Sequence, residues 1–321
     1  MRIIGTGSSV PSLVVSNDML SEILDTNDEW ISTRTGVKER RILSKETLVD
    51  IAVTAAQKAI EDAQISSVDL DYIVCSNLVN SYATPSLSSI IQGKIGASCP
   101  CLDINVACAG FVYALDISEA FLKMGKVKNI LIVCAEEPSR IVDWTQRDAS
   151  ILFGDGAAAA VVTDGDDLKA MHLSTTSNID SLYYHRKMEF NPFNNKEENT
   201  GPLVMNGKEI YKLAVSASTS EINLILQEAG LKADDIDYFI CHQANLRIIE
   251  TIRQNLNQTE DKFPHNIEKY GNTASASILI LLDELNKSKK IKSGDLIVLS
   301  AFGAGFTTGA CILSWSGSNN K

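Results

Sequence analysis

Three residues in the sequence combine a nucleophile with hydrogen-bond donors, namely Cys108, His242 and Asn272. Cys108 lies in the stretch DINVACAGF, directly before a segment of helical character. Because the N-terminus of a helix stabilises a thiolate, we expect the pKa of this thiol to be lowered. A thiolate and two donors for a developing oxyanion suit acyl transfer. The alternative is structural: a small core cysteine, a hydrogen-bonded core histidine and a helix N-cap.

An internal repeat indicates which elements position these residues. Residues 59–75 resemble residues 225–241, and residues 108–135 resemble residues 274–301, at the same offset of 166 (225 − 59 and 274 − 108). An offset shared by two segments indicates a duplicated α/β unit. Its apolar runs predict buried strands, which are expected at 73–78, 130–135, 238–241 and 296–301.

The duplication predicts that the three candidate residues converge. By the offset, Asn272 corresponds to Val106, two residues before Cys108. His242 directly follows the apolar strand at 238–241, at the end where α/β proteins bind ligands. Both apolar helices of the repeat begin with small residues, ACAG and ASAS, which would let the helix N-termini approach each other.

Composition restricts the class of protein and its partners. A chain of 321 residues that is 45% hydrophobic is globular with a large core, and it has no run of about 18 apolar residues to span a membrane. The net charge of −11 argues against nucleic acid and anionic membranes as partners. Since the start lacks the apolar region of a signal peptide, we expect a cytoplasmic protein whose seven cysteines are free thiols. The lone C-x-C at Cys99 and Cys101 does not predict a metal site.

Two local compositions point to ligand contacts. The stretch TRTGVKERR at 33–41 is either a basic site for an anionic ligand or a solvated loop. The stretch AFGAGFTTGA at 301–310 could supply a backbone N–H to an oxyanion hole, because glycine lets the backbone approach a ligand closely.

Seven ordered motifs carry a resemblance that covers almost the whole chain. They are DTNDEWISTRTGVKERR, DINVACAGF, DWTQRDASILFGDGA, MNGKEIYKLAV, CHQANLRI, YGNTASAS and AFGAGFTTGA. With them the chain resembles the β-ketoacyl-acyl-carrier-protein synthase III family of condensing enzymes. The resemblance implies a thiolase-like fold with layered α-β-α-β-α architecture. It implies two halves, residues 1–165 with the nucleophilic cysteine and residues 166–321 with the histidine and asparagine.

The resemblance also implies roles for individual residues. The catalytic triad would be Cys108, His242 and Asn272, and the oxyanion hole would be the backbone N–H groups of Cys108 and Ala304. The residues implied to bind coenzyme A are Trp30, Arg34, Arg147, Gly207 and Asn245. The residues implied to bind the carrier protein are Gln243, Ala244, Asn245, Leu246, Arg247, Lys212 and Arg253.

The reaction implied by the resemblance is a decarboxylative condensation that initiates fatty acid synthesis. A short acyl-CoA, such as acetyl-CoA, would react with malonyl-acyl-carrier protein to give a 3-oxoacyl-acyl-carrier protein. Such an enzyme would be a homodimer and would need no metal or other cofactor, since acyl-CoA is a substrate. The alternatives are a paralogue of specialised metabolism, which loads a different starter or acylates another acceptor, and an inactive scaffold.

Three sites depart from the family pattern: Ala304, Thr308, and the helix after HQANLR, which reads Arg253, Gln254 and Asn255 where a Lys/Arg pair is common. Ala304 stands where glycine is common, and a backbone donor survives this change. Thr308 stands where tryptophan is common, so we expect different packing near the pocket. The stretch NSYATPS at 80–86 is expected to line the acyl pocket, and it does not identify the acyl chain.

Overall fold

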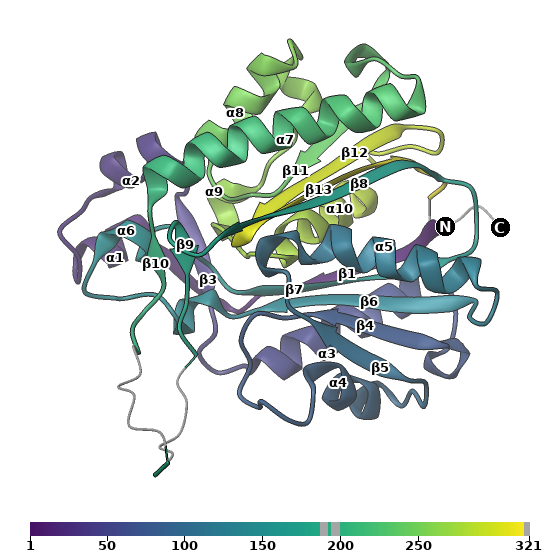
Figure 1. The fold of residues 1–321 in the computed structure, drawn as a ribbon. Coiled ribbons are helices and arrows are strands. Elements are labelled where there is room, and N and C mark those ends of the chain that lie inside the picture. Colours follow the sequence, from purple (N-terminus) through teal and green to yellow (C-terminus); the bar gives the residue numbers. More distant parts are fainter. Residues whose placement is uncertain (187–191, 194–199, 318–321) are drawn as a thin grey trace.

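The computed structural model describes residues 1–186, 192–193 and 200–317, and its main strands form two sheets (Figure 1). The first sheet has the order β1-β7-β6-β4-β5, with bounds β1 (Arg2–Ser9), β7 (Gly156–Thr163), β6 (Asn129–Glu136), β4 (Tyr72–Ser76) and β5 (Cys101–Ile104). The second sheet has the order β11-β12-β13-β8, with bounds β11 (Tyr238–Cys241), β12 (Leu296–Gly303), β13 (Gly305–Ser314) and β8 (Leu168–Asn178). The short pairs are β2 (Leu13–Ser16) with β3 (Glu39–Ile42), and β9 (Leu182–Tyr183) with β10 (Val204–Met205).

Helices lie between the two sheets and on their outer faces (Figure 1). The middle layer is α5 (Gly110–Lys123) and α10 (Ala276–Lys287). The outer layers are α3 (Leu48–Asp62) and α4 (Leu87–Ile95) on the first sheet, and α7 (Gly207–Ala229) and α8 (Leu246–Asn255) on the second. The remaining helices are α1 (Asn17–Ser21), α2 (Asp28–Thr35), α6 (Arg147–Ser150) and α9 (Ile267–Tyr270). This order of layers confirms the predicted α/β class and the α-β-α-β-α architecture.

The apolar character of α5 and α10 explains their place in the middle layer. A helix that is apolar on most faces must be covered on both sides. Leu115 in α5 and Leu279 in α10 are fully buried, and both belong to the core that joins the two sheets. Burying a side chain of this size stabilises the fold by about 1.5–3 kcal/mol. Small residues allow the close approach, since a Cβ on Gly110 would lie 1.8 Å from Ser76 Oγ.

The four predicted strands are confirmed as β4, β6, β11 and β12. β4 pairs in parallel with β6, and β11 pairs in parallel with β12. Because parallel strands end at the same edge of a sheet, the segments that follow β4 and β6 meet, as do those that follow β11 and β12. These edges lie at the N-terminal ends of α5 and α10.

The first strand is tied to an element near the end of the chain. β1 pairs with β7 in antiparallel register from Arg2 to Ser9. The hydroxyl groups of Thr6 and Ser8 then donate to the buried carboxyl of Asp283 in α10, at 2.7 and 2.6 Å. The first sheet and the middle layer are therefore joined by contacts between residues that are more than 270 positions apart.

Candidate active site

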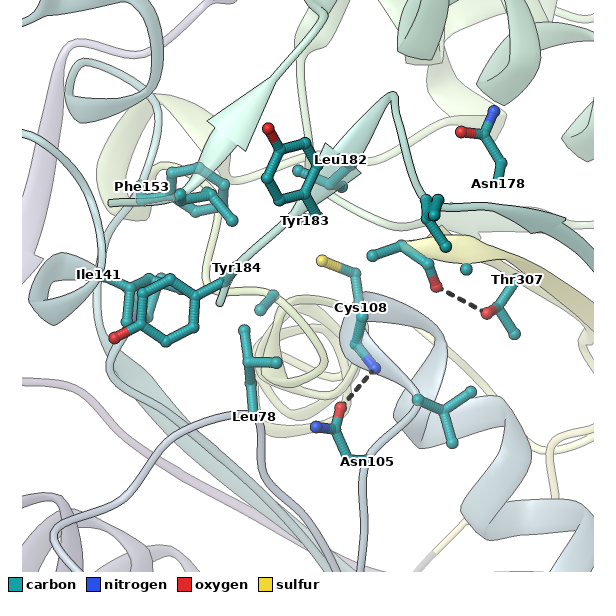
Figure 2. A pocket seen from close by; sticks show the side chains of 18 of the residues that line it. Leu78, Asn105, Cys108, Ile141, Phe153, Asn178, Leu182, Tyr183, Tyr184 and Thr307 are labelled. Atoms are coloured by element: carbon teal, nitrogen blue, oxygen red, sulfur yellow. Dashed lines mark hydrogen bonds between the residues drawn. The ribbon is translucent and has the colours of Figure 1, made fainter. Parts of the chain in front are cut away.

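A cavity of about 530 Å³ opens beside Cys108. Figure 2 shows the Cys108 sulfur directed into this cavity, toward Tyr183. Most of the wall is apolar and includes Leu78, Pro138, Ile141, Phe153, Leu182 and Leu203. A nucleophile on the wall of an apolar cavity can attack an acyl group whose chain is sheltered from water.

Cys108 lies in a 3₁₀ turn, Ala107–Ala109, that leads directly into α5. Its predicted place at the start of a helix is confirmed, but the expected lowering of its pKa is wrong. Burial, and then the nearby carboxyl of Glu136, raise the pKa of the Cys108 thiol to about 12. The cost of desolvating a thiolate in this apolar setting outweighs the stabilisation that the helix N-terminus provides.

His242 follows β11 and is held in a neutral state. Its backbone N–H donates to Ser300 O at 2.8 Å, and its ring packs edge-on against Phe302, with centroids 5.2 Å apart. Burial lowers the pKa of His242 to about 3. The Nδ1 atom lies 2.7 Å from Ser277 Oγ, which accepts the Gln243 backbone N–H at 3.2 Å. The Ser277 hydroxyl can therefore donate to Nδ1, which leaves the proton of the neutral ring on Nε2.

Asn272 is held on both sides by backbone contacts. Its N–H donates to Leu152 O at 2.8 Å, and its C=O accepts the Gly154 N–H at 3.1 Å. Its side-chain Oδ1 accepts the Ala274 N–H at 2.8 Å. Within the described residues the Nδ2 amide has no bonded partner, so it is available as a donor. Asn272 thus shapes the turn before α10, whose N-cap residue is Ser275.

The turn between β12 and β13 approaches the backbone of Cys108. A Cβ on Gly303 would lie 2.7 Å from Cys108 N, so only glycine permits this approach. Ala304 follows directly and lines the cavity together with Cys108 and Ala274. The structure therefore brings together the segments that carry the sequence-predicted nucleophile, donors and backbone N–H groups.

The described part of the chain has neither a metal-binding cluster nor a membrane-spanning helix. It contains no group of three or more His, Cys, Asp or Glu side chains placed to hold a metal ion. None of its helices is both long and apolar enough to cross a bilayer.

Comparisons with known proteins agree with this geometry. Residues 102–180 match the family model "3-Oxoacyl-[acyl-carrier-protein (ACP)] synthase III", and residues 226–315 match the model of its C-terminal part. The chain is 41% identical to the β-ketoacyl-[acyl-carrier-protein] synthase III of Clostridium acetobutylicum, over 98% of this chain and 99% of that one. It belongs to the synthase III family. The resemblance that the sequence carries is thus confirmed.

Solved structures of synthase III enzymes and their relatives share the fold. The 3-oxoacyl-[acyl-carrier-protein] synthase III of Aquifex aeolicus VF5 is 40% identical, with a TM-score of 0.92 over 98% of this chain and 99% of that one. A priming β-ketosynthase from the R1128 polyketide biosynthetic pathway is 33% identical, with a TM-score of 0.92 over 99% of this chain and 96% of that one. The thiolase-like fold class is therefore confirmed, and this synthase III is an acyl-transferring condensing enzyme.

Three of the residues expected to bind coenzyme A form one cluster on this synthase. The guanidinium carbons of Arg34 and Arg147 lie 3.3 and 4.3 Å from the ring centroid of Trp30. The other two lie at helix starts. Gly207 is the first residue of α7 and has open space around it, and Asn245 caps α8 by accepting the Arg247 N–H at 2.9 Å.

The basic stretch at 33–41 does not act as one surface patch. Arg40 is fully buried and donates to Val15 O, Asn17 Oδ1 and Ile151 O. Its guanidinium therefore braces the segment that leads to Phe153 and is not available to a ligand. Arg34, by contrast, lies on the surface beside Trp30. The stretch therefore contains one buried structural arginine and one surface cation.

Two of the residues expected to contact the carrier protein are buried, and for them the surface role is wrong. Gln243 is 1% exposed; its amide donates to Cys241 O and accepts the Asn266 N–H. Ala244 is 9% exposed. The chain is buried from Phe239 to Ala244, becomes partly exposed at Asn245 and Leu246, and is fully exposed at Arg247. Leu246 is partly buried, and Lys212 is exposed; Arg253 is bound to Glu250 and to Gln258 O.

The wall of the cavity differs from the sequence expectation. None of the stretch 80–86 lines the cavity at Cys108, and Asn80 and Tyr82 line a separate cavity of about 380 Å³ beside α3 and α4. The wall opposite Cys108 comes instead from segment 178–184, with its two adjacent tyrosines. Sequence analysis missed this segment, whose only signal is an aromatic pair after a strand.

Thr308 also faces away from the cavity. Because side chains alternate along a strand, Thr307 lines the cavity and Thr308 points to the other face of β13. There its hydroxyl donates to Glu221 Oε1 at 3.0 Å. The departure at Thr308 therefore changes the packing of α7 on the sheet rather than the pocket.

Proposed function

We propose that this synthase III catalyses the decarboxylative condensation of a short acyl-CoA with malonyl-acyl-carrier protein. The observation that carries the proposal is the Cys108 thiol on the wall of an apolar cavity, beside the segments that hold His242 and Asn272. The product is a 3-oxoacyl-acyl-carrier protein, the first intermediate of fatty acid synthesis. The names of its curated relatives support this choice of substrates.

The first half-reaction transfers the acyl group to Cys108. The sulfur attacks the thioester carbonyl of the acyl-CoA, the bond to the coenzyme A sulfur breaks, and the thiol proton leaves on coenzyme A. Negative charge that develops on the carbonyl oxygen is stabilised by the backbone N–H groups of Cys108 and Ala304. Since a thiol with a raised pKa is rarely ionised, these donors matter most at this step.

The second half-reaction removes CO₂ from the malonyl group and forms the new carbon–carbon bond. As the carboxylate leaves, its electron pair moves onto the malonyl thioester oxygen, where His242 Nε2–H and Asn272 Nδ2–H donate to it. The enolate carbon then attacks the acyl carbonyl on Cys108, the bond to sulfur breaks, and the thiolate that leaves takes a proton from water. A neutral histidine suits this role because it donates without being titrated.

The substrates are proposed to bind at separate cation sites. Trp30, Arg34 and Arg147 take the adenine and phosphates of coenzyme A, with Gly207 and Asn245 near its pantetheine arm. Arg247 and Lys212 meet the acidic carrier protein, together with the side chain of Leu246. Arg253 contributes less, because Glu250 already neutralises it.

The assembly and setting follow from the same proposal. The enzyme acts as a homodimer in the cytoplasm and uses no metal or other cofactor, because decarboxylation supplies the carbanion. A paralogue of specialised metabolism is the second candidate, favoured by a cavity far larger than an acetyl group and by likeness to a priming ketosynthase.

A panel of donors tests the proposal. The protein is incubated with malonyl-acyl-carrier protein and one acyl-CoA, from acetyl to octanoyl, and the acyl-carrier products are identified by mass. We expect 3-oxoacyl products, and label from acyl-CoA alone on the peptide of Cys108. Label on Cys75, Cys134 or Cys241 instead, or transfer only to an acceptor other than the malonyl thioester, would refute the proposed reaction.

A further inference from the structure

Glu136 is a buried carboxyl group beside the site that the proposed reaction does not use. It ends β6 and is 1% exposed. Its Oε2 accepts the Leu78 backbone N–H at 3.0 Å, and its Oε1 accepts the hydroxyl of Ser275 at 2.5 Å. The Ser275 oxygen in turn accepts the hydroxyl of Ser76 at 3.0 Å. Throughout the described ranges Glu136 forms no ion pair, so all its partners are neutral donors.

The duplication explains where this cluster stands. Ser76 corresponds to His242, and Glu136 corresponds to Phe302, at the same offset of 166 (242 − 76 and 302 − 136). In the second half the rings of His242 and Phe302 pack against each other. In the first half the equivalent positions hold Ser76 and Glu136, which are both hydrogen-bonded to Ser275. The duplicated unit therefore uses one copy of this position for chemistry and the other for internal hydrogen bonds.

The cluster holds two parts of the active site. Ser275 stands at the N-cap position of α10 without a side-chain capping bond, and it directly follows Ala274, which lines the cavity and whose N–H donates to Asn272 Oδ1. Leu78, the other partner of Glu136, forms part of the cavity wall. A shift of the Glu136 carboxyl would therefore move the turn that orients the Asn272 amide.

Among the residues that the structure describes, the titratable groups that face Glu136 are thiols. These are Cys108 before α5, Cys134 on β6 itself and Cys75 on β4. Burial raises the pKa of Glu136 to about 8, and a charge on Glu136 raises the pKa of Cys108. A carboxylate at Glu136 and a thiolate at Cys108 therefore oppose each other.

We propose that Glu136 is a positioning residue of the condensation site, which fixes the Asn272 turn through Ser275 and, while neutral, leaves Cys108 free to ionise. The positioning part of this inference rests on the proposed function, whereas the electrostatic part does not. Below the pKa of Glu136 the carboxyl is neutral and does not oppose the thiolate. Above it the carboxylate does, so the reactivity of Cys108 rises less steeply with pH than that of an isolated thiol.

Alkylation of Cys108 tests the electrostatic part without any substrate. Wild type and Glu136→Gln are treated with iodoacetamide from pH 6 to 10, and the rate at Cys108 is read from the mass of its peptide. We expect equal rates near pH 6.5 and a rate about three- to tenfold higher in Glu136→Gln at pH 9.5. In Ser275→Ala the break in the profile moves to higher pH, because the Ser275 hydroxyl no longer stabilises the carboxylate.

Steady-state rates test the positioning part. Ser275→Ala should lower kcat for condensation about tenfold, with KM for malonyl-acyl-carrier protein and the rate of acyl loading within about twofold. Glu221→Gln is the matched control, since Glu221 is a buried carboxyl bound to His172 and Thr308 on the far side of the sheet. It should change neither the alkylation profile nor the ratio of the half-reactions.

Two results would overturn the inference. One is an alkylation profile of Glu136→Gln that superimposes on that of the wild type. The other is a Ser275→Ala enzyme that loses loading and condensation equally. If the wild type itself does not condense, the proposed function fails, and the alkylation profile still decides whether Glu136 controls Cys108.

Discussion

Burial acts on both titratable residues of the proposed triad, and it keeps each of them neutral. It raises the pKa of Cys108 to about 12 and lowers that of His242 to about 3. Neither residue is therefore an ion at neutral pH, and the site works through hydrogen bonds to charge that appears during the reaction. The geometry of the donors around Cys108 therefore decides how well that developing charge is stabilised.

Replacing the two side-chain donors should separate the half-reactions. His242→Ala and Asn272→Ala remove donors to the malonyl thioester, so condensation should fall about 10²-fold or more in each. Loading of Cys108 should largely remain, since its oxyanion is met by backbone N–H groups. Mass measurement of the Cys108 peptide and release of CO₂ follow the two steps separately. Near-normal condensation in both variants would contradict the triad.

Arg147 and Arg247 should each affect the binding of a different substrate. Arg147 stacks on Trp30, so Arg147→Ala should raise KM for acyl-CoA and spare the carrier protein. Arg247 is exposed at the start of α8, so Arg247→Glu should raise KM for malonyl-acyl-carrier protein and spare loading. Steady-state kinetics with each substrate varied in turn measure both effects. Equal weakening of both steps by both variants would show that the cation sites are not separate.

At the scale of elements, α5 links the nucleophile to the core. It starts two residues after Cys108 and lies between the two sheets, where Leu115 is fully buried. Since a void there cannot be filled by solvent, Leu115→Ala should lower the free energy of unfolding by about 2–5 kcal/mol. Urea unfolding followed by circular dichroism measures this change. The exposed Asp116→Ala on the same helix should stay within about 0.5 kcal/mol of wild type.

The sequence predicted those elements whose signal is local. The apolar runs of β6 and β12, and the place of Cys108 before a helix, follow from composition over a few residues. The pKa of Cys108 could not be predicted, because it depends on the burial of the thiol in the folded chain and on the nearby carboxyl of Glu136. The hydrogen bond from Ser275 to Glu136 joins residues 139 positions apart, and no local sequence pattern predicts it. The burial of Gln243, whose side chain binds Asn266, likewise depends on a distant residue.

At the scale of the whole molecule, we expect two copies of the chain to associate. The stretch 80–86 presents an exposed Tyr82 beside a cavity that is separate from the active site, which suits a surface covered by a second subunit. Sedimentation at micromolar concentration should give about twice the chain mass of 34.9 kDa. A fully active species that sediments as a single chain would contradict this expectation.

The bonds from β1 to Asp283 have a consequence for biosynthesis. A ribosome makes Thr6 and Ser8 first, yet their partner on α10 appears only after most of the chain has been translated. Until then the face of the first sheet that α10 covers has no cover, and its apolar side chains meet water or a chaperone. Nascent chains arrested before residue 283 should therefore be cut readily by protease, whereas chains released at full length should resist it. β1 can therefore pair with β7 early in synthesis, whereas its bonds to the middle layer can form only after α10 has been made.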